Sequence, residues 1–246
     1  MKNNISKREI EELKSINAYT QENIKKLENN YPVQYLIGYV NFYGLKIKIN
    51  ESTLIPRYET EYLVEKTIKY INNFKMNCPK ILDLCTGSGA IGLTLKHEIP
   101  CSVTLSDIST DALKVATQNS KELNLDVNII ESDLLNNIKK EEYDVIISNP
   151  PYVMTSEILP ENVLYEPKLA LYSGSKGTDH IEKIFSNIKP YMKEKSLLAL
   201  EINEKSEKDL TKLINEYFNE EYTYSFEKDL AGKTRYLFIF KNLNKN

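Results

Sequence analysis

Two consecutive prolines, Pro150 and Pro151, constrain the fold of this chain more than any other feature. They end an apolar run at residues 143–148 that is typical of a buried strand. Because proline cannot donate a hydrogen bond to a sheet, two in succession force the chain away from it. Asn149 and Tyr152 flank this corner. A plain turn is one interpretation; the other is a functional site, because open α/β sheets place their chemistry at strand ends.

A glycine-rich turn lies upstream, between a short apolar run and a helix predicted for residues 90–97. Gly87, Gly89 and Gly92 match the G-x-G-x-x-G spacing of dinucleotide-binding turns, so NAD is a candidate ligand. Asp83, in the preceding strand, argues against NAD because a carboxylate there would repel a pyrophosphate. It suits a cationic ligand that bears an amino group, or it only orders the turn.

Acidic residues follow the next two predicted strands, at residues 101–106 and 127–132. Asp107 follows the glycine turn by about 20 residues, a position suited to binding both hydroxyls of a ribose. Alternatively it is an acidic partner for the next helix, with Ser109 as the helix cap. Asp133 is an acceptor for an adenine amino group. One edge of the sheet thus collects three carboxylates and an amide, from Asp83, Asp107, Asp133 and Asn149.

This constellation resembles the class I methyltransferases that use S-adenosylmethionine, and residues 149–152 resemble the tetrapeptide of those that methylate a planar nitrogen. The chain is more similar to one family within them, the glutamine methyltransferases that act on peptide-chain release factors. The similarity covers about residues 31–241 and includes segments at residues 32–38, 41–45, 54–61, 165–167, 174–177 and 229–235. The Pro-Arg-x-Glu-Thr-Glu stretch is the more discriminating motif, because nucleic-acid methyltransferases do not generally carry it.

The resemblance implies a role for each group of matching residues. The cofactor's methionine and ribose would be held by Cys85, Thr86, Gly87, Ser88, Gly89 and Asp107, and its adenine would be flanked by Asp133 and Leu134. Asn149 would touch both cofactor and substrate, and the glutamine pocket would be lined by Pro150, Pro151 and Tyr152. We expect Arg57 to shape the entrance of the site.

Three features depart from the family pattern. Leu134 stands where an aromatic residue is common, and Asn203 stands where glycine is usual. Only some 30 residues precede Pro32, where the family carries a larger helical domain that is expected to help grip the release factor.

The chemistry explains why an amide and a proline corner belong together. The nitrogen of a glutamine amide is a poor nucleophile, so the site must hold it in line with the methyl group. The side-chain oxygen of Asn149 and the backbone carbonyl of Pro150 would each accept one amide hydrogen, which stabilises positive charge on the nitrogen. Tyr152 would pack against the flat amide and exclude water. This reaction requires neither a metal nor a strong base.

Three other functions stay open at this point. The exocyclic amino group of a nucleic-acid base is also flat and carries two hydrogens, so the corner also suits a DNA or RNA methyltransferase. The net charge of −3 and the absence of a long basic block, apart from the lysine-rich termini, disfavour it. The second alternative is a catalytically inactive methyltransferase fold that serves as a binding subunit. A NAD enzyme ranks last.

The sequence predicts a Rossmann-like α/β class I methyltransferase fold with a mixed seven-stranded sheet. We divide the chain into a short helical segment (1–30), a β-hairpin linker (31–57) and the S-adenosylmethionine-binding domain (58–246). Helices are predicted for residues 6–29, 59–74 and 204–218, the hairpin for residues 39–49, and two final antiparallel strands near residues 222–226 and 235–240. Residues 149–176 are expected to form a proline-punctuated loop.

The composition and the cysteines of the chain predict the cellular location of the protein. The chain has no apolar run of 18 residues and no signal peptide. Cys78, Cys85 and Cys101 lack metal-ligand spacing, and their odd number predicts reduced thiols and a cytoplasmic protein, with Cys85 as a packing residue. We expect a protein substrate, no direct nucleic-acid contact, no membrane and a monomer.

Overall fold

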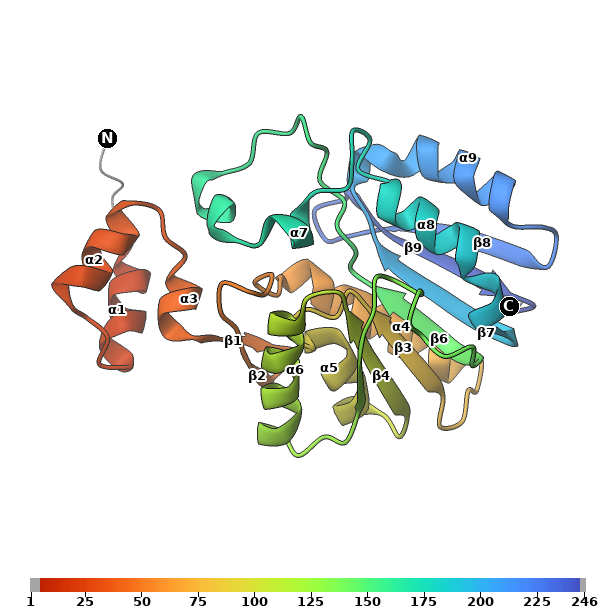
Figure 1. Ribbon diagram of the computed structural model, residues 1–246, viewed down its shortest axis with the longest axis horizontal. Helices are drawn as coiled ribbons and strands as arrows, with labels where there is room; N and C mark the ends of the chain where they lie inside the picture. The colour runs from red at the N-terminus through yellow and green to blue at the C-terminus, as the bar shows by residue number, and fades with distance from the viewer. Residues whose placement is uncertain (1–4, 244–246) are drawn as a thin grey trace.

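A seven-stranded sheet forms the centre of the computed structural model, which describes residues 5–243 (Figure 1). Its strand order is β5-β4-β3-β6-β7-β9-β8. The first five strands in this order run parallel, and β9 is antiparallel to both of its neighbours, which confirms the predicted mixed sheet. The strands are β3 (Lys80–Leu84), β4 (Ser102–Asp107), β5 (Asn128–Glu131), β6 (Tyr143–Ser148), β7 (Met192–Glu201), β8 (Tyr222–Lys228) and β9 (Thr234–Lys241).

The two faces of the sheet carry separate apolar cores, because successive side chains of a strand point to opposite faces. On one face, residues such as Ile81 and Val145 pack with α4 (Tyr58–Asn73), α5 (Ala90–Glu98) and α6 (Thr110–Glu122). On the other, their neighbours Leu82 and Ile146 pack with α8 (Asp179–Asn187) and α9 (Glu207–Tyr217). Both faces of the parallel strands are thus covered, as a doubly wound fold requires.

The amino-terminal helices form a small unit beside the sheet domain (Figure 1). They are α1 (Lys7–Ser15), α2 (Gln21–Glu28) and α3 (Val33–Ile37), and their own core contains Leu13, Leu27 and Val33. Ser6 and Glu9 form a capping box at the start of α1.

The prediction of one continuous helix over residues 6–29 is wrong at residues 16–20. Asn17 has a φ of 57°, a left-handed conformation that ends the first helix and that asparagine tolerates. The Thr20 hydroxyl then accepts a hydrogen bond from the Asn23 amide at 3.2 Å, which starts a second helix.

The predicted hairpin is present as β1 (Tyr39–Phe42) and β2 (Leu45–Lys48), and it packs into the main core through Phe42 and Ile47. Asn119 of α6 fastens it: its side chain accepts from the Lys48 amide at 2.8 Å and donates to the Lys48 carbonyl at 2.9 Å. The same amide group donates to the Ser88 carbonyl at 2.9 Å. One side chain therefore joins the hairpin to the glycine turn.

The sequence predicted a loop over residues 149–176, between β6 and α8, but part of this segment is helical. It contains the short helices η1 (Glu161–Tyr165) and α7 (Lys168–Leu171), and it lies between the amino-terminal helices and the sheet (Figure 1). The Tyr165 hydroxyl donates to the Asn29 carbonyl at 2.8 Å. Two further 3-10 turns flank β7, namely η2 (Lys189–Tyr191) and η3 (Glu204–Ser206).

Over residues 5–243, no helix combines the length and the apolar character needed to cross a membrane.

Gly92 provides a test of the packing between α5 and the sheet. A Cβ atom at this position would lie 2.2 Å from Leu105 Cδ2, inside the core. Helix propensity alone would make Gly92→Ala stabilising by about 1 kcal/mol. We expect instead a net loss of about 1–3 kcal/mol in the free energy of unfolding, because the core must shift to admit a methyl group. Urea denaturation measures the sign; a more stable variant would contradict the packing described here.

Candidate active site

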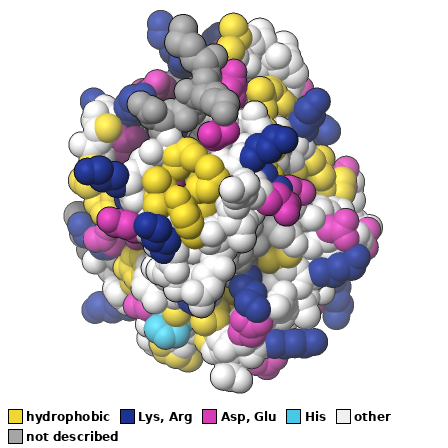
Figure 2. Space-filling view, turned by 90° about the vertical axis from the view of Figure 1, so that its left-hand side faces the viewer, with side chains coloured by type: hydrophobic (Ala, Val, Ile, Leu, Met, Phe, Trp, Pro, Cys, Tyr) yellow, Lys and Arg dark blue, Asp and Glu magenta, His cyan; other side chains and the backbone are white. Residues whose placement is uncertain are grey.

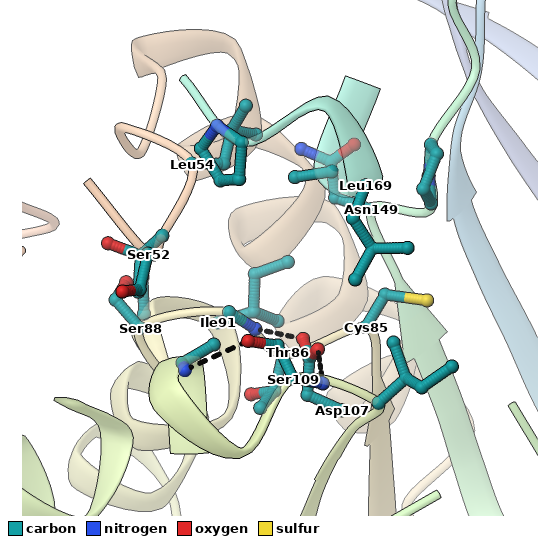
Figure 3. A pocket seen from close by; sticks show the side chains of 18 of the residues that line it. Ser52, Leu54, Cys85, Thr86, Ser88, Ile91, Asp107, Ser109, Asn149 and Leu169 are labelled. Carbon is teal, nitrogen blue, oxygen red and sulfur yellow. Dashed lines mark hydrogen bonds between the residues drawn. The ribbon is translucent and has the colours of Figure 1, made fainter. Parts of the chain in front are cut away.

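A cavity opens at the carboxyl ends of β3, β4 and β6 (Figure 3). Its wall contains nine of the residues singled out from the sequence: Cys85, Thr86, Gly87, Ser88, Asp107, Asp133, Leu134, Asn149 and Pro151. The lining does not include Asp83, Gly89, Pro150, Tyr152 or Arg57. The last four are neighbours in sequence of lining residues, and Asp83 accepts a hydrogen bond from the lining residue Thr86. Figure 3 shows Asp107 and Ser109 at the opposite end of the cavity from Leu54 and Leu169.

Strand register explains why these residues meet. Leu84, the last residue of β3, pairs with Ser106 on one side and with Ser148 on the other. Asp107 and Asn149 are the next residues along those neighbouring strands, so both reach the same edge. The chain continues from β3 outward through β4 and β5 and then returns to β6 on the other side of β3. Such a reversal leaves a crevice beyond the strand ends, where open α/β sheets bind ligands.

Asp83 is fully buried behind the glycine turn. Its Oδ2 accepts hydrogen bonds from the Thr86 hydroxyl at 2.6 Å and from the Gly92 amide at 2.9 Å. Burial raises the pKa of Asp83 to about 7, although these two hydrogen bonds oppose the shift. Oδ1 has no hydrogen-bond partner among residues 5–243. One oxygen therefore orders the turn, while the other is free to accept from a ligand or a water molecule.

Asp107 contacts the start of the next helix, which is one of the two roles that the sequence left open; its binding of a ribose stays a prediction. Its Oδ2 accepts from the Gly87 amide at 2.8 Å, and its Oδ1 accepts from the Ser109 amide at 2.9 Å. Ser109 in turn caps α6 through the Ala112 amide, as expected. The carboxylate thus orders the glycine turn and the helix start while it forms part of the cavity wall. Burial raises its pKa, and the backbone hydrogen bonds oppose that shift.

Cys85 carries a free thiol at the cavity wall, on a backbone with a φ of 57°. Desolvation, followed by the negative charge of Asp107, raises the pKa of this thiol well above its ordinary value. The group is therefore an uncharged packing residue of the turn.

The Pro-Pro corner is held by a chain of side-chain hydrogen bonds. Asn149 Nδ2 donates to Thr60 Oγ1 at 3.3 Å, and the Thr60 hydroxyl donates to Glu201 Oε2 at 2.7 Å. The Tyr152 hydroxyl donates to the other oxygen, Glu201 Oε1, at 2.9 Å. Burial and the neighbouring Glu201 raise the pKa of Tyr152 well above its usual value. Glu201 is itself buried, and its pKa is raised for that reason.

Gly177 and Asn203 both lie against the backbone carbonyl of Tyr152, at the end of the corner. A Cβ atom at Gly177 would lie 2.4 Å from the Tyr152 carbonyl oxygen, and its φ is +72°, so a side chain there would displace the corner. Asn203 Nδ2 donates to the same carbonyl at 3.4 Å, while its Oδ1 accepts from the Lys205 amide at 3.0 Å. The asparagine that departs from the family pattern therefore caps η3 and contacts Tyr152.

Arg57 pairs with Glu166, which is almost completely buried. The other Glu166 oxygen accepts from the Ile55 amide at 3.0 Å. This pair joins two segments on which the family resemblance rested, residues 54–61 and 165–167. Arg57 thus braces the loop that carries Pro56 and Thr60 into the cavity wall.

Sequence reasoning assigned no role in the site to Thr60, Glu201 or Glu166. A signal existed for Glu201, because it ends the apolar run of β7 in the same way as Asp107 ends β4. Thr60 belongs to the Pro-Arg-x-Glu-Thr-Glu stretch, where only the charged residues attracted attention. No comparable signal marked Leu54 and Leu169, which reach the wall from a loop and from α7.

The charge of the wall limits what the cavity can bind. Within the described part of the chain, the lining includes the carboxylates of Asp107 and Asp133 and neither lysine nor arginine. Such a wall repels a pyrophosphate and accepts hydrogen bonds from hydroxyl and amino groups. It therefore fits a nucleoside with a cationic substituent better than it fits NAD.

The family model described as methyltransferase small domain matches residues 66–170. Release factor glutamine methyltransferase from Streptococcus pneumoniae is 36% identical over 225 residues, which cover 90% of this chain and 79% of that protein. The enzyme of the same name from Clostridium acetobutylicum is 38% identical, with 92% of this chain and 80% of that protein covered.

Solved structures share the fold at low sequence identity. A methyltransferase from Pyrococcus furiosus has a TM-score of 0.60 at 20% identity and covers 81% of this chain and 90% of its own. The T. thermophilus 16S rRNA N2 G1207 methyltransferase has a TM-score of 0.60 at 16% identity and covers 82% of this chain and 49% of its own.

The relatives confirm the resemblance that the sequence motifs carried, and they do so over nearly the whole chain. This chain belongs to the family of release factor glutamine methyltransferases.

Proposed function

We propose that this protein transfers a methyl group from S-adenosylmethionine to the side-chain amide nitrogen of a glutamine in peptide-chain release factors. The observation that carries this proposal is the position of Asn149, at the end of β6 in the wall of an acidic cavity and directly before the Pro-Pro corner. The names of the relatives from S. pneumoniae and C. acetobutylicum support the substrate.

The residues of the cavity suit the cofactor. Asp107 would accept from the ribose hydroxyls, Asp133 and Leu134 would flank the adenine, and residues 85–89 would contact the methionine part. The unpaired Oδ1 of Asp83 is an acceptor suited to the amino group of the cofactor's methionine part, by a direct hydrogen bond or through a water molecule. When bound, S-adenosylmethionine supplies an electrophilic methyl group on a positively charged sulfur. Leu134 would contact the adenine through an aliphatic side chain in place of an aromatic one.

Asn149 and Pro150 would orient the glutamine. The Asn149 side-chain oxygen and the Pro150 carbonyl each accept one hydrogen of the substrate amide, which fixes the amide plane. Holding the nitrogen in an attacking position removes several kcal/mol from the barrier. Pro151 and the partly buried Tyr152 would exclude water from the glutamine, and Arg57 would stabilise the entrance through its pair with Glu166.

A protein substrate also fits the surface of the molecule. On the face formed by the amino-terminal helices, acidic and basic side chains are interspersed around an apolar patch (Figure 2). Mixed charge suits a protein partner better than the phosphates of a nucleic acid, which select a continuous basic stripe. We propose further that the protein acts as a monomer in the cytoplasm.

Asn149→Ala tests the proposed chemistry. We expect the rate of methyl transfer to a release factor to fall by about 100-fold or more, because the variant lacks an acceptor that strengthens as charge builds on the nitrogen. Transfer of labelled methyl groups from S-adenosylmethionine measures this rate. Controls are the same factor with its loop glutamine replaced, and mixed nucleic acid, neither of which should be labelled. Full activity of Asn149→Ala, or label on nucleic acid, would refute the proposal.

Asp83→Asn tests the cofactor site through its pH dependence. A cationic ligand favours the ionised carboxylate, so below the pKa of about 7 the wild-type dissociation constant should fall as pH rises. The steepest expected change is about tenfold per pH unit. Well below the pKa, each increase of one pH unit raises the ionised fraction of the carboxyl about tenfold. The variant has no such group and should lack this slope. Calorimetric titration between pH 5.5 and 8 (a range of about one unit on either side of the pKa) compares the two proteins. Identical slopes would show that Asp83 does not act on the cofactor.

A further inference from the structure

We infer that Thr60 is a positioning residue which sets the orientation of the Asn149 amide, and that Glu201 fixes the direction of its hydroxyl. This inference rests on the proposed function, because it explains why the Asn149 oxygen is available to a substrate amide. It starts from the hydrogen bonds that connect three elements of the fold: the start of α4, the end of β7 and the Pro-Pro corner.

The single proton of the Thr60 hydroxyl determines which way the Asn149 amide faces. A threonine hydroxyl has one proton to donate and two lone pairs to accept with. Thr60 donates its proton to Glu201 Oε2 at 2.7 Å. Its contact with the Asn149 side chain at 3.3 Å must therefore be made by a donor, which is Nδ2. Once Nδ2 faces Thr60, the side-chain oxygen of Asn149 is directed away from it and remains an acceptor for a substrate.

Glu201 fixes the direction of this relay. It is 1% exposed, and each of its two oxygens accepts from a hydroxyl, Thr60 at Oε2 and Tyr152 at Oε1. Burial raises the pKa of Glu201, while the hydrogen bonds from Thr60 and Tyr152 and the positive charge of Arg235 oppose that shift and favour the ionised form. In its ionised form this carboxylate can only accept hydrogen bonds, so it holds the Thr60 proton on its own side. If the Asn149 amide were flipped, its side-chain oxygen would face Thr60 Oγ1. The proton of that hydroxyl is already donated to Glu201, so no hydrogen bond could form.

The location of Thr60 fits a positioning role. It is 3% exposed, it belongs to the cavity wall, and it lies in the first turn of α4 within the Pro-Arg-x-Glu-Thr-Glu stretch. The Arg57–Glu166 pair braces the start of that stretch. The motif therefore delivers a hydroxyl to the site, and its Arg57 holds the loop that precedes α4.

Thr60→Val is the decisive variant, because valine keeps the shape of threonine and removes the hydroxyl. We expect kcat for methyl transfer to fall by about tenfold to 100-fold, as for other losses of alignment. The KM for the release factor and the dissociation constant of S-adenosylmethionine should stay unchanged. Thr60→Ser retains the hydroxyl and should restore most of the rate. The matched control is Thr67→Val, which removes another buried hydroxyl of α4, one that donates to the Leu63 carbonyl of its own helix.

A double substitution separates positioning from general damage to the fold. In an Asn149→Ala background, Thr60→Val should cause almost no further loss of kcat, since the side chain that it orients is absent. A full additional loss there, an unchanged kcat in the single variant, or an equal loss in Thr67→Val would each overturn the inference.

The orientation of the amide can also be measured without any methyl transfer. In a ¹⁵N-labelled protein, the Asn149 side-chain resonances are those that vanish in Asn149→Ala. We expect Thr60→Val, and not Thr60→Ser, to shift them and to speed the exchange of their protons with water. Unshifted resonances would refute the relay. A wild-type protein that methylates no release factor would instead refute the proposed function, and these spectra would still decide the relay.

Discussion

The alignment of the parallel strands is the constraint on which the rest of the site depends. Because β4, β3, β6 and β7 run in one direction and in register, residues far apart in sequence reach one edge of the sheet. Asp107, Asn149 and Glu201 all lie at that edge, although 94 residues separate the first from the last. Two apolar cores, one on each face, hold this register, so a slip of one strand would misplace the site as well as expose the core.

Local patterns were sufficient to predict most of the fold. The apolar runs of β3, β4 and β6, the glycine turn, the Ser6 capping box and the hairpin all follow from interactions between neighbours in sequence, and the structure contains each of them. The break between α1 and α2 was missed because its signal is weak. A single asparagine in a left-handed conformation and a capping threonine interrupt a pattern that otherwise continues as a helix.

The contacts that complete the site could not be predicted in this way, because they are pairs formed across the fold. Thr60 meets Glu201 across 141 positions, Arg57 meets Glu166 across 109, and Asn119 meets the hairpin across 71. Each buried polar group needs a partner, but the sequence does not say which of many candidates supplies it. Motifs marked the neighbourhood of the site, as with residues 54–61, while the partners of each side chain emerged only from the folded chain.

The protonated thiol of Cys85 has a consequence for chemoselectivity. A methylsulfonium is an alkylating agent, and thiolates are far stronger nucleophiles than amides or thiols. A cavity that holds such an agent beside a cysteine risks methylating itself. Desolvation and the charge of Asp107 raise the pKa of this thiol and so disfavour the nucleophilic thiolate. With the proposed donor in this cavity, that shift would make the cysteine a poorer methyl acceptor.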